Sequence, residues 1–432
     1  MRRKDLKNLV EWKAKNSRKP LIINGARQVG KTWLINEFGK KHFLNLAYIN
    51  FETTKSLSEV FNSGYQIDKI IKAIEIEVKA KIDPATTLII FDEVQQEPKA
   101  LTALKYFYEQ APQYHIICAG SLLGISMQNG GSFPVGKVEF LDLYPLNFYE
   151  YLDALNETAL RASLELHEWD IIRGFHSRLK DLLRQYFYLG GMPEVLKIFI
   201  NNRDFNQARE IQNQILRSYE LDFSKHAPGS IIPRIRMMWN SIPSQLAKEN
   251  KKFIYNAIKP GARSKDYELA LEWLLDAGLV YKVNNISTAK VPLKNYENLD
   301  AFKLYVVDVG LLGAMVNIQP AAKLDNYSLL QEFKGSLTEQ FVLQELKASK
   351  KAIPYYWSPS NAKAEVDFLF ENRSNIFPLE VKAAENLQSK SLRVFNENYK
   401  PEMCFRTSMS NYRKEDWLTN IPLYSIQEIF NL

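Results

Sequence analysis

The sequence predicts an α/β protein with a mainly parallel β-sheet, and three apolar stretches carry this prediction. Leu21–Asn24 (LIIN), Thr87–Phe91 (TLIIF) and Tyr114–Ala119 (YHIICA) are short, nearly continuous apolar runs. Runs of this kind are typical of parallel strands that helices cover on both faces. Helical patterns lie between them, and the clearest is Ile67–Lys81, which carries a stripe of isoleucines at helical spacing.

Further elements are expected in chain order around these stretches. We expect a helix over residues 4–17, a strand over 47–52 (AYINFE), a strand over 137–143, and a helix with Pro145 near its first turn. Residues 146–225 have helical patterns throughout. Within them, Gly190 and Gly191 are expected to separate two helices. This pair is either a hinge or, more simply, a turn between helices.

The residues after the first apolar run form a phosphate-binding pattern. Gly25–Thr32 reads GARQVGKT, which fits G-x-x-x-x-G-K-S/T. Its glycines let backbone N–H groups turn toward phosphate oxygens, Lys31 reaches the β- and γ-phosphates, and the Thr32 hydroxyl ligates magnesium. A helix over residues 31–41 would point its positive N-terminal end at these phosphates, and chance matches generally lack such a helix and the preceding strand. The residues expected to surround the nucleotide are Gly25, Ala26, Arg27, Gln28, Val29, Gly30, Lys31, Thr32 and Trp33.

Two acids end the second apolar run, as in a Walker B motif. Asp92 would hold magnesium through its water shell, and Glu93 would orient and deprotonate the attacking water. The alternative is that these acids cap the next helix. The third run ends at Gly120 and Ser121. Ser121 would contact the γ-phosphate or the attacking water, or else cap the next turn.

Size and composition limit the class of protein. The chain has 432 residues, enough for several domains, and its 46% hydrophobic and 12% aromatic content describes a folded protein. Cys118 and Cys404 are too few for a disulfide framework or a zinc site and indicate a reducing compartment. The charged N-terminal stretch lacks the apolar region of a secretion signal, and the most apolar later stretch, 304–316, is too short to span a membrane. We expect a soluble, cytoplasmic protein with no membrane contact.

Basic residues are concentrated in one region. The formal net charge is +7, and residues 231–265 hold eight basic residues against one acid, Glu249, so this region alone accounts for +7. The basic residues are Arg234, Arg236, Lys248, Lys251, Lys252, Lys259, Arg263 and Lys265. A local excess of this kind indicates a polyanion partner, and DNA is the partner we expect for it. The alternative is a solvated surface with an accidental excess of charge.

The basic region belongs to a pattern that resembles a winged helix. Residues 231–283 are expected to form three helices and a strand, and a second strand is expected at Phe302–Asp308. The third helix, Ser264–Ala277, would be the one to enter a major groove. Its apolar side is expected to be Leu269, Leu271, Leu274 and Leu275, and its acids are Asp266, Glu268 and Glu272. These acids would repel phosphates, which favours a protein contact or a contact to the DNA backbone alone.

The C-terminal part carries acids in a pattern that resembles the PD-(D/E)XK phosphodiesterase fold. Glu339 lies in a predicted helix, Asp367 in a predicted strand, and Glu380 and Lys382 in the next strand. Residues two apart in a strand share a face, so Asp367 and Glu380 could bind magnesium while Lys382 activates the attacking water. The alternative is an ion-paired core, with Glu380 bound to Lys382 or Lys363 in an inactive domain.

Several motifs together resemble the prokaryotic AAA-type ATPases that carry an uncharacterised C-terminal domain. They are GARQVGKT, LIIFDEVQ, CAGSLLG, SFPVGKVEFLDLYPLNFYEYL, YLGGMPEV and SYELDFSKH; these motifs lie between Gly25 and His226, and the similarity as a whole covers nearly the whole chain. The resemblance implies an ATPase core with its strands in AAA order and Ser121 as the sensor residue. It implies no physiological substrate. Arg184 and Arg217 are candidates for an arginine finger, and the alternative for each is a surface ion pair.

We therefore expect an ATP- and Mg²⁺-dependent molecular switch linked to DNA. The expected domains are an AAA-type P-loop NTPase domain at 1–150, a helical segment at 151–230, a winged-helix-like module at 231–320 and a small α/β nuclease-like domain at 325–432. One alternative is an ATP-binding regulatory or signalling protein that binds a protein partner and whose nuclease-like domain is inactive. A small-molecule kinase is less favoured, because Glu93 after Asp92 suits water activation. The sequence leaves the oligomeric state open.

Overall fold

The computed structural model describes residues 2–120, 134–248, 251–318, 334–359, 364–372, 374–383 and 389–432. The chain divides into two compact units. The N-terminal unit comprises Arg2–Tyr144 with Trp273–Leu279, and the C-terminal unit comprises Pro145–Glu272 with Val280–Leu432. Ser121 lies outside the described residues.

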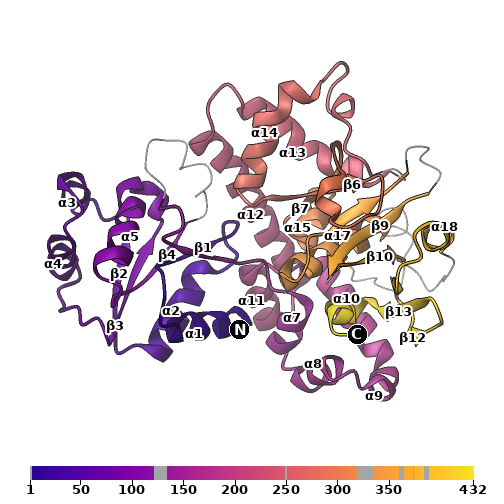
Figure 1. Cartoon of the computed structure of the whole chain (residues 1–432), viewed down its shortest axis with the longest axis horizontal. Helices are drawn as coiled ribbons and strands as arrows, with labels where there is room; N and C mark the ends of the chain where they lie inside the picture. The colour runs from indigo at the N-terminus through magenta and orange to yellow at the C-terminus, as the bar shows by residue number, and fades with distance from the viewer. Residues whose placement is uncertain are drawn as a thin grey trace. The chain divides into compact units, whose positions relative to one another are not determined.

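The N-terminal unit is built on a five-stranded sheet in the order β2-β3-β4-β1-β5 (Figure 1). All of its strand pairs are parallel, so the predicted parallel sheet is confirmed. The strands are β1 (Leu21–Asn24), β2 (Asn45–Asn50), β3 (Thr87–Asp92), β4 (His115–Ala119) and β5 (Glu139–Asp142). The helices are α1 (Asp5–Ala14), α2 (Lys31–His42), α3 (Ser58–Ser63), α4 (Ile67–Val78), η1 (Val94–Gln96) and α5 (Pro98–Gln110).

Helices on both faces of this sheet explain the continuous apolar runs of its central strands. On one face, Ile89 and Phe91 of β3 lie in a core that also contains buried residues of α4 and α5. On the other face, a Cβ on Gly39 of α2 would lie within 3.3 Å of side-chain atoms of Leu46 and Leu88. Alternate residues of a strand point to opposite faces, so both sets of β3 side chains need to be apolar.

Element boundaries differ from the predicted ones by a few residues, for local reasons. The strand expected over 47–52 is β2, which ends at Asn50 before a turn. The helix expected to reach Lys81 ends at Val78, because Lys79 adopts a left-handed conformation with φ of 54°. The helix expected to contain Pro145 starts later, since Asn147 and Glu150 form a capping box at its N-terminus.

The first part of the C-terminal unit is helical, as the sequence predicts. Its helices are α7 (Phe148–Ala154), α8 (Thr158–Glu165), α9 (Trp169–Gly174), α10 (His176–Leu189), α11 (Pro193–Asn202), α12 (Phe205–His226), α13 (Ile232–Leu246), η3 (Tyr255–Ala257) and α14 (Ser264–Asp276). The last four residues of α14 group with the N-terminal unit. No helix among the described residues is long and apolar enough to cross a bilayer.

The turn between α10 and α11 is tightly packed. A Cβ on Gly190 would lie 2.0 Å from Asp308 Oδ1, and one on Gly191 would lie 2.0 Å from the Leu146 carbonyl oxygen. The Gly191 N–H donates to Asp308 Oδ2 at 2.6 Å. Because no side chain fits at either position, the two glycines serve close packing within the C-terminal unit, which supports the simpler interpretation of a turn.

The rest of the C-terminal unit forms one eight-stranded mixed sheet in the order β12-β13-β11-β10-β9-β8-β6-β7. Its strands are β6 (Val280–Ile286), β7 (Glu297–Val306), β8 (Tyr355–Trp357), β9 (Val366–Asn372), β10 (Asn375–Val381), β11 (Cys404–Ser408), β12 (Arg413–Lys414) and β13 (Leu418–Pro422). The helices among them are η4 (Leu293–Tyr296), α15 (Val309–Met315), α17 (Lys334–Ser349), α18 (Lys390–Tyr399) and η5 (Leu423–Phe430).

Two features of the winged-helix prediction need correction. In the described residues of 231–283 there are two α-helices, α13 and α14, and the 3-10 turn η3 lies between them. The ribbon of β6 and β7 is also not separate, because β6 pairs in parallel with β8 and so joins the C-terminal strands in one sheet. The boundary expected near residue 320 therefore does not separate two sheets. Leu269, expected on the apolar side of the third helix, is 63% exposed.

Candidate active site

The loop between β1 and α2 has the curled backbone that the phosphate-binding pattern requires. Gly25 has φ of +146° and Gly30 has φ of +95°. A Cβ on Gly25 would lie 2.3 Å from the backbone oxygen of Leu143, so a side chain there would collide with the chain after β5. Gly30 is the N-cap of α2, which begins at Lys31. The loop therefore leads directly into a helix N-terminus, where anions are stabilised.

Lys31 lies folded across this loop. Its Nζ atom donates to the Gly25 and Ala26 carbonyl oxygens at 2.8 Å each. Burial lowers the pKa of Lys31 to about 8, although the negative charges of Glu93 and Asp92 oppose that shift. An anionic ligand beside Nζ would favour the charged form of the lysine.

Asp92 at the end of β3 is held by donors on both of its carboxylate oxygens. Thr32 Oγ1 donates to Asp92 Oδ2 at 2.9 Å, and the Tyr48 hydroxyl donates to the same oxygen at 2.7 Å. The Glu93 N–H donates to Asp92 Oδ1 at 3.0 Å. A hydroxyl beside a carboxylate suits Mg²⁺, which proteins bind through one or two carboxylates together with substrate phosphates. The structure thus brings together the two residues expected to bind the metal.

Glu93 occupies the N-cap position of η1, but its side chain does not cap that turn. It has φ of +51° and makes no side-chain hydrogen bond that would cap η1. Instead, its Oε2 atom accepts a hydrogen bond from the Gln95 side chain. The geometry therefore gives no support to the alternative in which Glu93 caps the next helix.

Three residues that the sequence did not single out support this site. Tyr48 is one, through its bond to Asp92. Arg3 is buried and donates to the Val29 carbonyl at 3.0 Å and to the Tyr144 carbonyl at 2.6 Å. Gly278 is the third, since its Cβ would lie 3.2 Å from the Ala26 nitrogen. Arg3 and Gly278 carry no local motif that could have revealed them, because their partners lie far away in the sequence.

The predicted arginine candidates lie in the C-terminal unit. Arg184 pairs with Asp181 one turn away on α10, at 2.7 Å. Arg217 is an exposed residue of α12. The ion pair fits the surface alternative for Arg184. Neither residue is placed relative to the P-loop.

The predicted C-terminal constellation comes together within the C-terminal unit. The carboxyl groups of Glu339, Asp367 and Glu380 are close enough that desolvation and the two glutamates together raise the pKa of Asp367 well above its usual range. Asp367 Oδ2 accepts from the Val381 N–H at 2.7 Å, and Lys382 Nζ lies 2.6 Å from Glu380 Oε1. Glu380 is 6% exposed, and its other oxygen, Oε2, has no hydrogen-bond partner among the described residues.

Lysines surround the remaining acid of this cluster. Glu339 pairs with Lys251, and its second oxygen lies 3.7 Å from Lys303 Nζ and accepts from the Tyr305 hydroxyl at 3.1 Å. Burial opposes ionisation of Glu339, but the two lysines outweigh it and lower the pKa of this carboxyl. Lys251, which was expected in the DNA-binding region, is thus turned into the protein. The described residues contain no group of three or more histidine, cysteine or acidic side chains placed to hold a metal.

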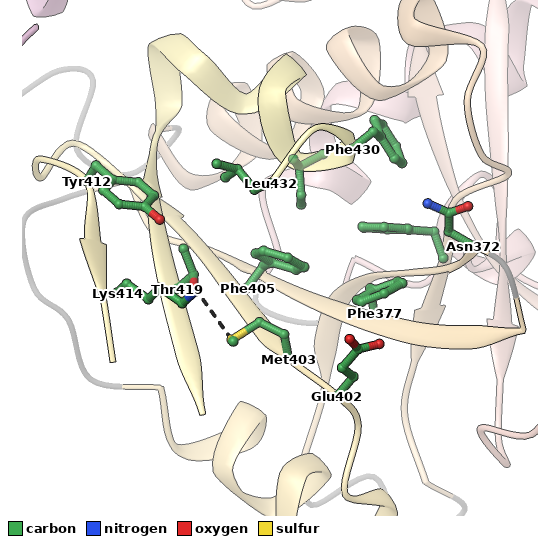
Figure 2. Close-up of a pocket in the computed structure, with 12 residues that line it drawn as sticks. Asn372, Phe377, Glu402, Met403, Phe405, Tyr412, Lys414, Thr419, Phe430 and Leu432 are labelled. Atoms are coloured by element: carbon green, nitrogen blue, oxygen red, sulfur yellow. Dashed lines mark hydrogen bonds between the residues drawn. The ribbon is translucent and has the colours of Figure 1, made fainter. Parts of the chain in front are cut away.

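A cavity of about 300 Å³ lies elsewhere in the C-terminal unit, lined by strand residues and by η5. Figure 2 shows Tyr412 and Lys414 on one side of it, Asn372 and Glu402 on the other, and the ring of Phe405 between them. None of the four residues of the predicted nuclease-like site lines this cavity. The sequence did not reveal it, because its walls come from several short segments near the C-terminus.

Three protein families match separate parts of the chain. Residues 17–152 match the AAA domain family, residues 180–322 match a domain of unknown function, DUF8612, and residues 334–426 match another, DUF4143. A search of curated proteins found no match. The AAA match covers the whole of the P-loop and the Asp92 strand.

Three solved structures are similar to this chain at low sequence identity, and each has a TM-score below 0.5. The Walker-type ATPase PABY2304 of Pyrococcus abyssi has 14% identity, with 73% of this chain and 95% of that chain covered and a TM-score of 0.47. The Aeropyrum pernix Orc1 protein in complex with DNA has 12% identity, coverage of 72% and 91%, and a TM-score of 0.29. A RuvB variant of Thermotoga maritima has 14% identity, coverage of 67% and 88%, and a TM-score of 0.27. Residues 17–152 therefore combine a match to the AAA domain family with a P-loop and a five-stranded parallel sheet, which is the P-loop NTPase fold.

Proposed function

We propose that the N-terminal unit binds and hydrolyses Mg-ATP and acts as a molecular switch. One observation carries this proposal. The P-loop and the end of β3 meet in one site, where Thr32 Oγ1 lies 2.9 Å from Asp92 Oδ2. When bound, Mg²⁺ would neutralise charge that develops on the phosphates. Lys31 would move from the carbonyls of Gly25 and Ala26 to the phosphates, an exchange of neutral for anionic acceptors.

Glu93 has the position and freedom of a general base in this proposal. It follows Asp92 directly at the carboxyl end of β3, where ligands bind in open parallel sheets. The Gln95 side chain donates to its carboxylate and would orient it without neutralising it. Glu93 would therefore orient the attacking water and accept its proton.

Mg²⁺-dependent ATP hydrolysis by wild type and Glu93→Gln tests the proposal. Because the amide cannot accept the proton, we expect hydrolysis to fall on the order of a hundredfold or more, while ATP binding is retained. Glu59→Gln, at an exposed position on α3, is the matched control and should hydrolyse at the wild-type rate. Equal rates in wild type and Glu93→Gln would remove Glu93 from the mechanism.

A link to DNA is the finer part of the proposal, and exposed basic residues of the C-terminal unit support it. Of the eight basic residues in 231–265, six are exposed: Arg234, Arg236, Lys248, Lys259, Arg263 and Lys265. The same hydrolysis assay is repeated with duplex DNA at two salt concentrations. Hydrolysis that rises with DNA and loses this rise at high salt fits several phosphate contacts. Hydrolysis indifferent to DNA would favour the regulatory alternative, in which the exposed Leu269 beside Glu268 and Glu272 meets a protein partner.

The cluster of Glu339, Asp367 and Glu380 in the C-terminal unit supports a second candidate function, phosphodiester cleavage, through one observation. Among the described residues, Glu380 Oε2 is buried without a partner, next to Asp367, whose pKa its neighbours raise. A divalent cation would supply the missing partner and relieve the repulsion between these carboxylates. Asp367 and Glu380 would hold that cation, and Lys382 would lie beside the attacking water.

Cleavage of duplex DNA with Mg²⁺ or Mn²⁺ tests this candidate. We expect Asp367→Asn to lose cleavage by about a hundredfold or more, because the neutral side chain weakens cation binding. Adding the cation should raise the unfolding temperature of wild type and leave that of Asp367→Asn unchanged. Glu397→Gln, at an exposed position on α18, is the control. If wild type neither cleaves nor gains stability from either cation, the ion pairs of Glu339 and Glu380 are structural and the domain is inactive.

A further inference from the structure

Tyr48 lies on the strand next to Asp92 and reaches the same carboxylate oxygen as Thr32. Its hydroxyl donates to Asp92 Oδ2 at 2.7 Å, and Thr32 Oγ1 donates to that oxygen at 2.9 Å. The remaining oxygen, Oδ1, accepts the Glu93 N–H at 3.0 Å. A carboxylate held by three donors cannot turn about its last side-chain bond without breaking at least one of them.

The strand register explains why a tyrosine suits this position. β2 runs parallel to β3, with Tyr48 beside Ile90 and Asn50 beside Asp92. Tyr48 and Asp92 therefore share one face of the sheet, two residues apart along the strand direction. A long side chain is needed to cover that diagonal. The phenol ring does so and places its oxygen at the carboxylate.

The phenol is also confined to the role of a donor. A tyrosine hydroxyl ionises only near pH 10, about three units above neutral. The hydroxyl therefore keeps its proton throughout the neutral range and directs it at Asp92 Oδ2. The side chain is nonetheless 38% exposed, so it stands at the opening of the site and not in the core.

We propose that Tyr48 is a positioning residue that fixes Asp92 toward Thr32 and thereby sets the Mg²⁺ dependence of nucleotide binding. This inference rests on the proposed function of the N-terminal unit. Groups that hydrogen-bond to a metal-binding side chain and fix its orientation are worth about tenfold or more in metal affinity. Without the Tyr48 hydroxyl, one of the three donors is lost, and Asp92 samples orientations that no longer face the metal position.

The test compares ADP binding with Mg²⁺ and with EDTA in the full chain. For each protein, the ratio of the two dissociation constants measures how strongly the cation supports the nucleotide. Tyr48→Phe removes only the hydroxyl. Tyr106→Phe is the matched control, because Tyr106 stacks on Tyr65 with ring centroids 4.6 Å apart and makes no bond to Asp92. Circular dichroism melting verifies that all three proteins are folded.

We expect Tyr48→Phe to reduce this ratio about tenfold, with an unchanged dissociation constant in EDTA. Tyr106→Phe should keep the wild-type ratio. An unchanged ratio in Tyr48→Phe would overturn the inference and leave the proposed function intact. An equal loss of affinity with Mg²⁺ and with EDTA would also overturn it, since that result describes a general role in folding. A wild type whose ADP binding ignores Mg²⁺ would overturn both the inference and the proposed function.

Discussion

Single side chains at the P-loop act through charge and burial. Asp92 is 4% exposed and accepts hydrogen bonds from Thr32, Tyr48 and the Glu93 main chain, so these three donors fix its orientation before any ligand binds. Lys31 is buried as well, but its two acceptors are neutral carbonyl oxygens. The site therefore contains a carboxyl group with three hydrogen-bond donors and a buried lysine whose hydrogen-bond acceptors are both neutral.

The ionisation of Lys31 leads to a pH prediction. Its pKa is lowered to about 8 by burial, and phosphate oxygens beside Nζ would raise it again. Above pH 8 the free lysine is largely neutral while the bound lysine is charged. Nucleotide binding should therefore take up protons, and affinity should fall as the pH rises through this window.

Calorimetry of ADP binding at pH 9, in two buffers of different ionisation enthalpy, measures this uptake. We expect up to about one proton for each bound nucleotide in wild type. Lys31→Met should show none, and Lys72→Met, at an exposed position on α4, should match wild type. Equal heats in the two buffers for wild type would contradict the assigned pKa.

At the scale of elements, the P-loop depends on a close approach between two backbone segments. Gly25 starts the loop with φ of +146°, and a Cβ there would lie 2.3 Å from the Leu143 oxygen. Gly64, at the end of α3, has a similar φ of +134° but open space around it. The two glycines share the conformational strain of a side chain at positive φ and differ only in the collision. They form a natural pair of test positions.

Gly25→Ala and Gly64→Ala separate strain from collision. Strain alone costs on the order of 1–3 kcal/mol, so Gly64→Ala should lower the unfolding temperature modestly and keep nucleotide affinity. Gly25→Ala should destabilise more and abolish ADP binding, because the first turn of the P-loop must move away from Leu143. Thermal unfolding and ADP titration of both variants provide the measurements. If the two variants show the same unfolding temperature change and the same ADP affinity, the chain relieves the collision with the Leu143 oxygen without cost.

Element positions were predictable wherever a pattern is local. The apolar runs predicted the positions of β1, β3 and β4. Both faces of these strands are covered, so nearly all of their side chains are buried and apolar. Ends of elements were less predictable. Val78 ends α4 through the left-handed conformation of Lys79, which a charged residue does not signal in a sequence. The start of α7 required recognition of the capping pair Asn147 and Glu150.

At the scale of the whole molecule, chain order and spatial order differ. β6 and β7 precede α17 by dozens of residues, yet β6 pairs with β8 and completes an eight-stranded sheet with the C-terminal strands. The segment Trp273–Leu279 likewise groups with the N-terminal unit. Such pairings depend on contacts between distant segments, so a division of the sequence into consecutive modules could not reveal them.

The sequence by itself determined the identity of the P-loop and of the acids at the end of β3. These features are short, and their chemistry follows from residue type and spacing, as for Lys31 and Thr32. Only the tertiary structure decided which groups distant in the sequence become partners. Arg3 reaches Val29, Tyr48 reaches Asp92, and Lys251 turns from the basic region to Glu339. A side chain's partner across a sheet or between helices depends on how the chain packs, and local spacing does not encode it.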